Sequence, residues 1–380
     1  MPRLPAAFDD EAMGTMSNRG EEVTMQTGNT RAAGRGVTFG LGLSALLAST
    51  ILTVGAQSAP PKPAVDKSVK VADGVYEVVA GSDAVYVAST GRRGPDAKPE
   101  AKIVVLDPKT LDVKKSIDVT AEPAFGLGLN EKTQMLYTSN TRSGSVSVID
   151  LKAGKVVATI KSEADPKAHT FRVLADEANN KVYVSLASKD GKIWIIDGKT
   201  NTIAHTITGL VTPTGLALDA AANRLYTALM GSNEIGVIDL KTNEVVSRYP
   251  AGGERPTQLA FDARTSRLFI TNQASGDMTV LDTKAGTIVK TVKTGAQALG
   301  IGFNPKTNRI YVANRQAGTV SVIDATSYEI LAELPAGTLP NTVSVDPRTN
   351  LTYITNKAKG GGRGAPPVDD PNGDTVTMIK

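Results

Sequence analysis

Short runs of alternating hydrophobic and polar residues follow one another along the chain, and their arrangement returns seven times. One run in each repeat carries an aromatic residue at a fixed place, with spacings of 51, 46, 43, 43, 42 and 42 residues: Tyr86, Tyr137, Tyr183, Tyr226, Phe269, Tyr311 and Tyr353. A second, apolar run ends in Asp in six repeats and at Lys380 in the seventh: Asp107, Asp150, Asp197, Asp239, Asp282 and Asp324. A period near 42 residues with β-type alternation is typical of a propeller in which each repeat forms one four-stranded sheet.

The repeat at 213–250 shows its four predicted strands most clearly. From the axis outward we name them A, B, C and D, and place them at 214–218, 225–229, 235–239 and 245–249. The segments between them are rich in Asn, Asp, Gly and Ser, which favour β-turns. Strand A alternates large with small side chains, and successive side chains point to opposite faces of a sheet. Each blade can therefore pack a small face against the bulky face of its neighbour, with the strand B aromatics in the core between blades.

The two ends of the chain are predicted to complete one another. The last repeat has strands A, B and C at 342–345, 352–355 and 375–379, but the chain ends before a strand D. An additional strand at 68–71 precedes the first strand A and has no other partner. We predict that it supplies the outer strand of the seventh blade, so that the ring is closed by a sheet that contains both chain ends. The sequence thus predicts an all-β, seven-bladed propeller over 65–380, with four antiparallel strands in each blade.

The N-terminal region has the pattern of an export signal. Arg31 and Arg35 precede an apolar run of 18 residues without charge at 37–54, and Val54, Gly55 and Ala56 are small residues that suit cleavage before Gln57. An uncleaved membrane anchor is the alternative, since about 18 apolar residues nearly span a bilayer. We expect 1–56 to be an extension with a signal peptide and 57–64 a linker. We also expect an exported monomer without stable membrane insertion after cleavage, periplasmic in a Gram-negative source and otherwise secreted or envelope-associated.

Composition restricts the chemistry that the chain can perform. There is no Cys, which excludes disulfides and thiolate metal sites. There are two His and no HExxH, P-loop or GxSxG motif, and we predict no cofactor. The Asp that ends each strand C is interpreted as a turn residue that bonds to the backbone rather than as a calcium ligand. A net charge of +4 is too small to indicate nucleic acid by itself.

Three strings carry a resemblance to a known family: IYVANRQAGTVSVID at 310–324, LFITN at 268–272 and TYITN at 352–356. They resemble the YVTN-repeat propellers, particularly the exported YncE-like proteins, and the resemblance covers roughly 65–380. The matching residues are packing and turn residues, so the resemblance implies the fold. Relatives of this type are described as single-stranded-DNA-binding, surface-layer or cofactor-biogenesis proteins, and more distant seven-bladed rings include lactonases and lyases. The fold alone therefore does not indicate which of these functions the protein has.

The ligands of propellers usually bind over the ring axis, on the face formed by the D–A loops and the B–C turns. Two B–C connections are long, at 91–102 in blade 1 and 357–374 in blade 7, and ring closure makes these blades neighbours. They supply four candidates for contact with an anionic or macromolecular partner: Arg92, Arg93, Lys357 and Arg363. The alternative is that both connections are solvated loops without a binding role.

Blade 3 departs from the repeat in strand A. Arg172 stands where other repeats have a smaller or neutral residue: Gly126, Gly215, Gln258, Gly300 and Thr342. A guanidinium near the axis needs a partner or water. Further candidates on the same face complete a predicted anion-accepting rim: His169, Arg255, Gln258, Arg142 and Arg315. The alternative is that Arg172 pairs with an acid such as Glu77 or Asp165.

These patterns favour a non-enzymatic binding or scaffold protein with its site on the B–C/D–A face and an unknown protein or anionic ligand as partner. A lactonase-type hydrolase or lyase is one alternative, for which His169, Arg172 and Glu77 would have to converge. Single-stranded DNA binding is another, and it requires stacking aromatics beside a positive groove. Aromatic residues make up 4% of the chain, and the repeated ones are predicted to lie in the core. Trp194, the single Trp, is predicted in a strand C, and His205 in an exposed strand D.

Overall fold

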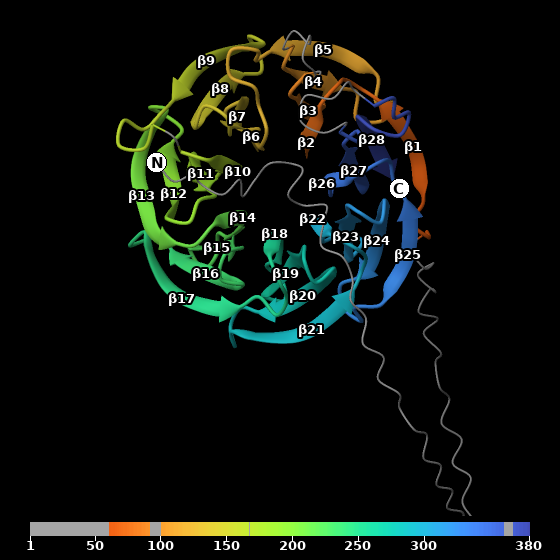
Figure 1. Cartoon of the computed structure of the whole chain (residues 1–380). Coiled ribbons are helices and arrows are strands. Elements are labelled where there is room, and N and C mark those ends of the chain that lie inside the picture. The colour runs from red at the N-terminus through yellow and green to blue at the C-terminus, as the bar shows by residue number, and fades with distance from the viewer. Residues whose placement is uncertain (1–60, 92–99, 167, 361–367) are drawn as a thin grey trace, which may run out of the picture. The chain divides into compact units, whose positions relative to one another are not determined.

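The strands of the computed structural model form seven separate four-stranded antiparallel sheets (Figure 1). The structure describes residues 61–91, 100–166, 168–360 and 368–380, which lie in one compact unit, Pro60–Lys380. Within this unit the sheets follow one another around a ring as blades 1 to 7. The predicted all-β, seven-bladed propeller is therefore confirmed.

Each blade runs from an inner strand A to an outer strand D. The A strands are β2 (Val75–Ala80), β6 (Leu127–Asn130), β10 (Thr170–Asp176), β14 (Pro213–Asp219), β18 (Pro256–Asp262), β22 (Ala298–Asn304) and β26 (Pro340–Asp346). The B strands are β3 (Val85–Ser89), β7 (Met135–Asn140), β11 (Lys181–Leu186), β15 (Arg224–Leu229), β19 (Arg267–Asn272), β23 (Arg309–Asn314) and β27 (Leu351–Asn356). The C strands are β4 (Lys102–Leu106), β8 (Ser145–Asp150), β12 (Gly191–Asp197), β16 (Glu234–Asp239), β20 (Asp277–Asp282), β24 (Thr319–Asp324) and β28 (Thr375–Ile379). The D strands are β5 (Val113–Asp118), β9 (Lys155–Ile160), β13 (Thr202–Leu210), β17 (Glu244–Pro250), β21 (Thr287–Lys293), β25 (Ile330–Pro335) and β1 (Val65–Lys70).

Blade 7 is built from both ends of the described chain, as predicted. β1 pairs antiparallel with β28, with Lys70 opposite Thr375 and Val65 opposite Ile379. The strand begins three residues before the predicted 68–71, because the ladder continues past Val65. There Ala64 and Lys380 exchange backbone hydrogen bonds of 3.0 and 3.2 Å. The sheet order β1-β28-β27-β26 therefore closes the ring within one sheet.

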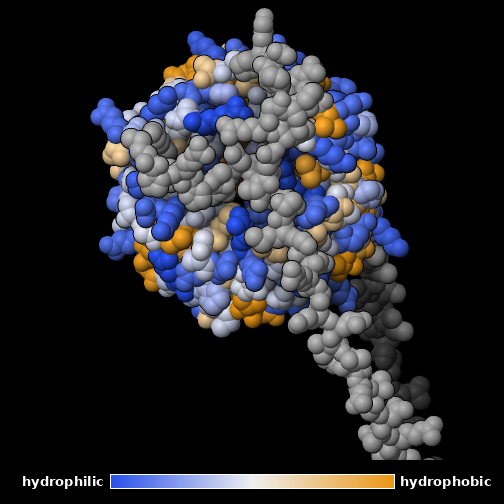
Figure 2. Space-filling model, viewed as in Figure 1, coloured by the Kyte–Doolittle hydropathy of each residue, from blue (hydrophilic) through white to orange (hydrophobic). Residues whose placement is uncertain are grey.

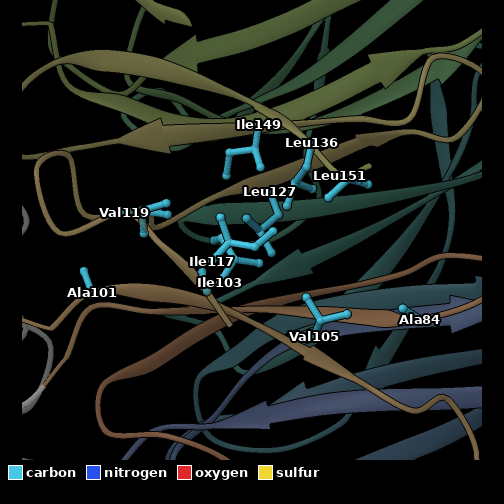
Figure 3. Packing of buried hydrophobic residues seen from close by; sticks show 12 residues of the cluster. Ala84, Ala101, Ile103, Val105, Ile117, Val119, Leu127, Leu136, Ile149 and Leu151 are labelled. Carbon is cyan, nitrogen blue, oxygen red and sulfur yellow. The ribbon is translucent and has the colours of Figure 1, made fainter. Parts of the chain in front are cut away.

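The hydrophobic core lies between the blades. Figure 3 shows Ile103 and Ile117 of blade 1 beside Leu127, Leu136 and Ile149 of blade 2. Six of the seven strand B aromatics are fully buried in such clusters and Tyr86 is partly buried, as the predicted inter-blade packing requires. Trp194 is buried in β12, and His205 is exposed on the outer strand β13. Apolar residues on the outer strands lie in small separate groups among hydrophilic ones, which is ordinary for a protein surface (Figure 2).

The polar residues that recur at the ends of strands B and C have structural roles. The Asp at each C–D turn accepts backbone hydrogen bonds; Asp197 Oδ1, for example, accepts the N–H groups of Lys199 and Thr200 at 2.7 and 3.1 Å. These bonds hold the pKa of the Asp197 carboxyl below its usual range. The Asn that ends strand B in the family-like strings donates to side-chain oxygens of strand C, as Asn314 does to Thr319 and Ser321 and Asn272 does to Asp277 and Thr279. The turn interpretation of Asp is thus confirmed, and these asparagines link strands B and C.

Candidate functional site

Every strand A is interrupted near its start by a β-bulge, where two residues face one residue of strand B. In blade 2, for instance, Phe125 and Gly126 both bond to the backbone of Ser139, and the other six A strands shift register at the equivalent place. The first bulge positions are Tyr76, Phe125, Phe171, Thr214, Thr257, Leu299 and Asn341. The second bulge positions are Glu77, Gly126, Arg172, Gly215, Gln258, Gly300 and Thr342. A bulge re-aims side chains and is common beside functional sites.

Hydroxyl groups on strand B fix several of these bulges to the next blade. Ser139 Oγ donates to the carbonyl oxygen of Phe171 at 2.6 Å, and Thr355 Oγ1 donates to that of Tyr76 at 3.0 Å. Both hydroxyls are buried, so their bonds are shielded from competition by water. The first bulge residues therefore have fixed backbone positions at the inner edge of the ring.

Glu77 and Arg172 form an ion pair that crosses an intervening blade. Arg172 Nη1 of blade 3 donates to Glu77 Oε1 of blade 1, and Gly126 of blade 2 lies between them. The Glu77 side chain is 5% exposed and that of Arg172 is 21% exposed. Burial lowers the pKa of Arg172 to about 10, which leaves the guanidinium charged at neutral pH. Of the two acids expected to pair with Arg172, Glu77 is its partner, whereas Asp165 pairs with Lys192 at 2.7 Å.

Gly126 makes the crossing possible because it leaves space at the inner edge of blade 2. A Cβ atom there would lie 2.3 Å from the carbonyl oxygen of Phe171 and 3.4 Å from Glu77 Oε2. We expect Gly126→Ala to lower the free energy of unfolding by about 2 kcal/mol, since backbone must shift to relieve the overlap. Urea unfolding followed by Trp194 fluorescence measures this.

The matched control for that substitution is Gly236→Ala in β16. Its Cβ would lie 3.1 Å from the Thr227 methyl group, which is a side-chain contact. We expect this control to change the free energy of unfolding by less than about 1 kcal/mol. Equal effects of the two substitutions would contradict the tight approach at Gly126.

Three of the candidate cations are linked to Tyr76 of blade 1, one by direct contact with its ring and two through a second residue. Lys357 Nζ lies 4.6 Å from the centre of the Tyr76 ring, and Tyr76 meets Phe125 edge to face at 5.0 Å. Arg142 Cζ lies 5.6 Å from the centre of the Phe125 ring. Asn341 accepts from Arg315 Nη1 at 2.5 Å and donates to the carbonyl oxygen of Tyr76 at 2.8 Å. We name this group the cationic rim: Arg142, Arg315, Lys357, Tyr76, Phe125 and Asn341.

The other predicted site residues are more scattered. Among the described residues the His169 side chain makes no hydrogen bond or ion pair with Glu77 or Arg172, and burial lowers its pKa and favours the neutral imidazole. Arg255 is exposed on blade 5, with Nη2 3.4 Å from Met230 Sδ of blade 4. Gln258 occupies the second bulge position of blade 5 and is buried. The bulges thus bring Arg172 and Gln258 to the same level of the ring.

The two long B–C connections meet the same D–A loop. Asp374 of blade 7 accepts from the N–H of Val75 at 3.1 Å, and Thr90 of blade 1 donates to the carbonyl oxygen of Gly74 at 2.9 Å. Their described ends are therefore adjacent, as ring closure predicts. The candidates within their central parts lie outside the described residues: Arg92, Arg93 and Arg363.

Sequence reasoning missed the aromatic residues at the first bulge position. Tyr76, Phe125 and Phe171 come from three consecutive blades, whereas blades 4 to 7 have Thr, Thr, Leu and Asn there. The available signal was an aromatic directly before the second bulge position in blades 1 to 3. Within the described ranges, no group of three or more His, Asp or Glu side chains is placed to hold a metal ion. The same ranges contain no helix long and apolar enough to cross a membrane.

Seven four-stranded sheets closed by a shared terminal blade define a seven-bladed β-propeller. A family model described as a YNCE-like beta-propeller matches residues 76–359, and the chain belongs to this family. The chain is similar to the uncharacterized protein YncE of Salmonella typhi, with 34% identity over 215 residues that cover 54% of this chain and 58% of the relative. For the uncharacterized protein YncE of Escherichia coli K12, identity is 34% over 188 residues, or 47% of this chain and 52% of the relative.

The chain thus spans little more than half the length of these curated relatives. Among solved structures, a chain of the hydrazine synthase of Kuenenia stuttgartiensis superimposes with a TM-score of 0.63 and 16% identity. That match covers 76% of this chain and 94% of the other. At such low identity it concerns the fold alone.

Proposed function

We propose that the protein is an exported, non-enzymatic binding or scaffold propeller that accepts an anionic ligand or partner on its B–C/D–A face. The export part is supported by the apolar run at 37–54, which lies outside the described residues. The binding part is supported by one observation above the others, the grouping of Arg142, Arg315 and Lys357 in the cationic rim. Blades 2, 6 and 7 contribute these cations, so the grouping depends on ring closure.

Ion pairs elsewhere on the B–C/D–A face also support an anion-binding site at the rim. Two acids of the D–A loops have basic partners, Glu122 with Lys161 at 2.8 Å and Asp165 with Lys192 at 2.7 Å. The contacts of the three rim cations include two aromatic rings and an amide oxygen. Cations over aromatic rings keep their charge, because the ring supplies a quadrupole and no proton acceptor. These rings therefore leave the positive charge of Arg142 and Lys357 in place; Arg142 is exposed and Lys357 is 7% exposed.

The test is a double substitution, Arg142→Gln with Lys357→Gln, in the full chain. Fluorescein-labelled polyglutamate and a labelled oligodeoxythymidylate of about 20 nucleotides serve as probes, with binding measured by fluorescence anisotropy at 50 to 200 mM salt. We expect about a tenfold loss of affinity at the lowest salt, and a salt slope for the oligonucleotide that is shallower by about 1.4.

The control removes two charges from the opposite face, by Lys199→Gln with Lys241→Gln at exposed C–D turns. It should bind both probes within twofold of the unchanged protein. An equal loss in both double variants would show that net charge, and not the rim, determines binding, and the proposal would fail.

Single-stranded nucleic acid is the second candidate ligand. The observation in its favour is the series Tyr76, Phe125 and Phe171 at the first bulge position of adjacent blades, beside Arg142 and Lys357. Stacking of a base on an aromatic ring contributes about 1–3 kcal/mol. In the same experiment, Phe171→Leu should weaken the oligonucleotide about tenfold and leave polyglutamate unchanged. Equal binding of the oligonucleotide by this variant would remove the second candidate.

A further inference from the structure

The side-chain amide of Asn341 joins two other blades at the cationic rim. Its oxygen accepts a hydrogen bond from Arg315 Nη1 of blade 6 at 2.5 Å, and its nitrogen donates to the carbonyl oxygen of Tyr76 in blade 1 at 2.8 Å. A guanidinium group can only donate and a carbonyl oxygen can only accept, so these two partners determine the orientation of the amide. Asn341 is 4% exposed and Arg315 is 6% exposed, so the bond between them is shielded from water.

The backbone of Asn341 is held in place as well. Asn341 occupies the first bulge position of β26, and the N–H of the next residue, Thr342, donates to Thr355 Oγ1 at 3.2 Å. A Cβ atom on Gly300 of blade 6 would lie 2.6 Å from the Asn341 carbonyl oxygen, so the backbones of the two blades approach closely here. The amide therefore extends from a backbone that is fixed by its own blade and by blade 6.

Two other blades show which part of this arrangement recurs. At the first bulge position of blades 4 and 5, the hydroxyls of Thr214 and Thr257 donate to carbonyl oxygens of the next blade at 3.2 and 3.3 Å. Asn341 makes the same kind of bond to blade 1. Because an amide has its acceptor and its donor on separate atoms, Asn341 also holds Arg315 at the same time. The contact with a cation is what the amide adds to the recurring bond.

We propose that Asn341 is a positioning residue that joins the cationic rim into one anion-binding surface. It holds the Arg315 guanidinium and the Tyr76 backbone in a fixed relative position, and Lys357 Nζ lies 4.6 Å from the centre of the Tyr76 ring. The neutral amide binds the guanidinium without neutralising it, which a carboxylate in the same place would do. Asn341 thus acts through Arg315 and not by touching the ligand. The inference rests on the proposed function, because it concerns the same site.

Asn341→Thr in the full chain separates the two bonds of the amide. The hydroxyl can donate to the Tyr76 carbonyl oxygen, as threonine does in blades 4 and 5, but its oxygen is one bond nearer to the backbone and does not reach Arg315. We expect about threefold weaker binding of the labelled polyglutamate and oligodeoxythymidylate at the lowest salt. Threonine is native at this position in two blades, so the variant should fold, and urea unfolding followed by Trp194 fluorescence checks this.

A double-mutant cycle in binding distinguishes positioning from a general structural role. Arg315→Gln alone should weaken both probes about fivefold, and in the Asn341→Thr background it should weaken them less than about twofold further. If the two losses multiply, Asn341 does not act through Arg315 and the proposal is overturned. Binding by Asn341→Thr that equals that of the unchanged protein overturns it as well.

Asn341→Asp tests the same contact through charge. The carboxylate keeps the bond from Arg315, but it neutralises the guanidinium and cannot donate to the Tyr76 carbonyl oxygen. We expect both probes to bind at least as weakly as they do to Arg315→Gln, and the salt slope for the oligonucleotide to be shallower by about 0.7. An unchanged slope would show that Arg315 does not contribute to anion binding, and the proposal would be rejected.

Asn372→Thr and Asn372→Asp are the matched controls, because Asn372 is exposed on the B–C connection of the same blade. Both should bind the probes within twofold of the unchanged protein, and losses equal to those of the Asn341 variants would reject the proposal. The proposed function can fail separately. If Arg142→Gln with Lys357→Gln leaves polyanion binding intact, the proposed function fails and this inference fails with it. If that variant loses binding and the Asn341 variants do not, only this inference is rejected.

Discussion

Replacing β1 by a six-residue Gly/Ser linker in the full chain should lower the free energy of unfolding by about 5 kcal/mol. The substitution removes the ladder between β1 and β28 and the packing of Val65 and Val69 against neighbouring cores. It also exposes the edge of β28, whose residues are all buried in the closed ring. Urea unfolding followed by Trp194 fluorescence measures the loss.

Lys70→Ser is the control within the same strand. Lys70 is exposed and opposite Thr375, and its replacement leaves the backbone pairing intact. We expect a change of less than about 0.5 kcal/mol. A linker variant as stable as this control would mean that the terminal strand does not hold the ring closed.

Glu77→Gln should destabilise the protein by about 3–5 kcal/mol, because it leaves the Arg172 guanidinium at a buried position without its counter-charge. The pair crosses blade 2, so its loss also removes a direct connection between blades 1 and 3. Arg172→Met in the Glu77→Gln background removes the uncompensated charge and should recover a large part of the loss. Urea unfolding of the two single variants and the double variant gives the coupling energy.

Glu234→Gln provides the comparison at the surface. The pair of Glu234 with Arg248 has an N–O distance of 3.5 Å and both side chains are about a third exposed. Such pairs contribute about 0–1 kcal/mol. If Glu77→Gln costs no more than Glu234→Gln, the crossing pair is not a stabilising element.

The propeller fold could be predicted from the sequence because the same pattern of strands and turns repeats seven times. A period near 42 residues sets the number of blades, and the missing strand D of the last repeat identifies the role of the strand near residue 65. Strand boundaries differ by one residue at most ends of blade 4, since alternation marks the buried centre of a strand better than its last hydrogen bond.

The site was less predictable for a definite physical reason. Simple alternation assigns each residue of strand A to one of two faces, but a bulge inserts one residue and changes the faces of those before it. Phe125 and Tyr76 were therefore not recognised as neighbours. Arg172 was singled out as unusual, yet the choice between Glu77 and Asp165 depends on a contact over Gly126 that spacing along the chain does not encode.

The shared blade also determines the order in which this molecule can mature. Ser68 and Thr377, whose hydroxyls are 3.0 Å apart, are separated by 309 positions, so Ser68 is synthesised long before Thr377. On the ribosome, blades 1 to 6 can acquire all four of their strands before β28, strand C of blade 7, has been synthesised. The nascent protein must therefore keep β1 unpaired until β28 has been synthesised, and a chaperone that covers residues 65–70 during that interval would protect this unpaired strand.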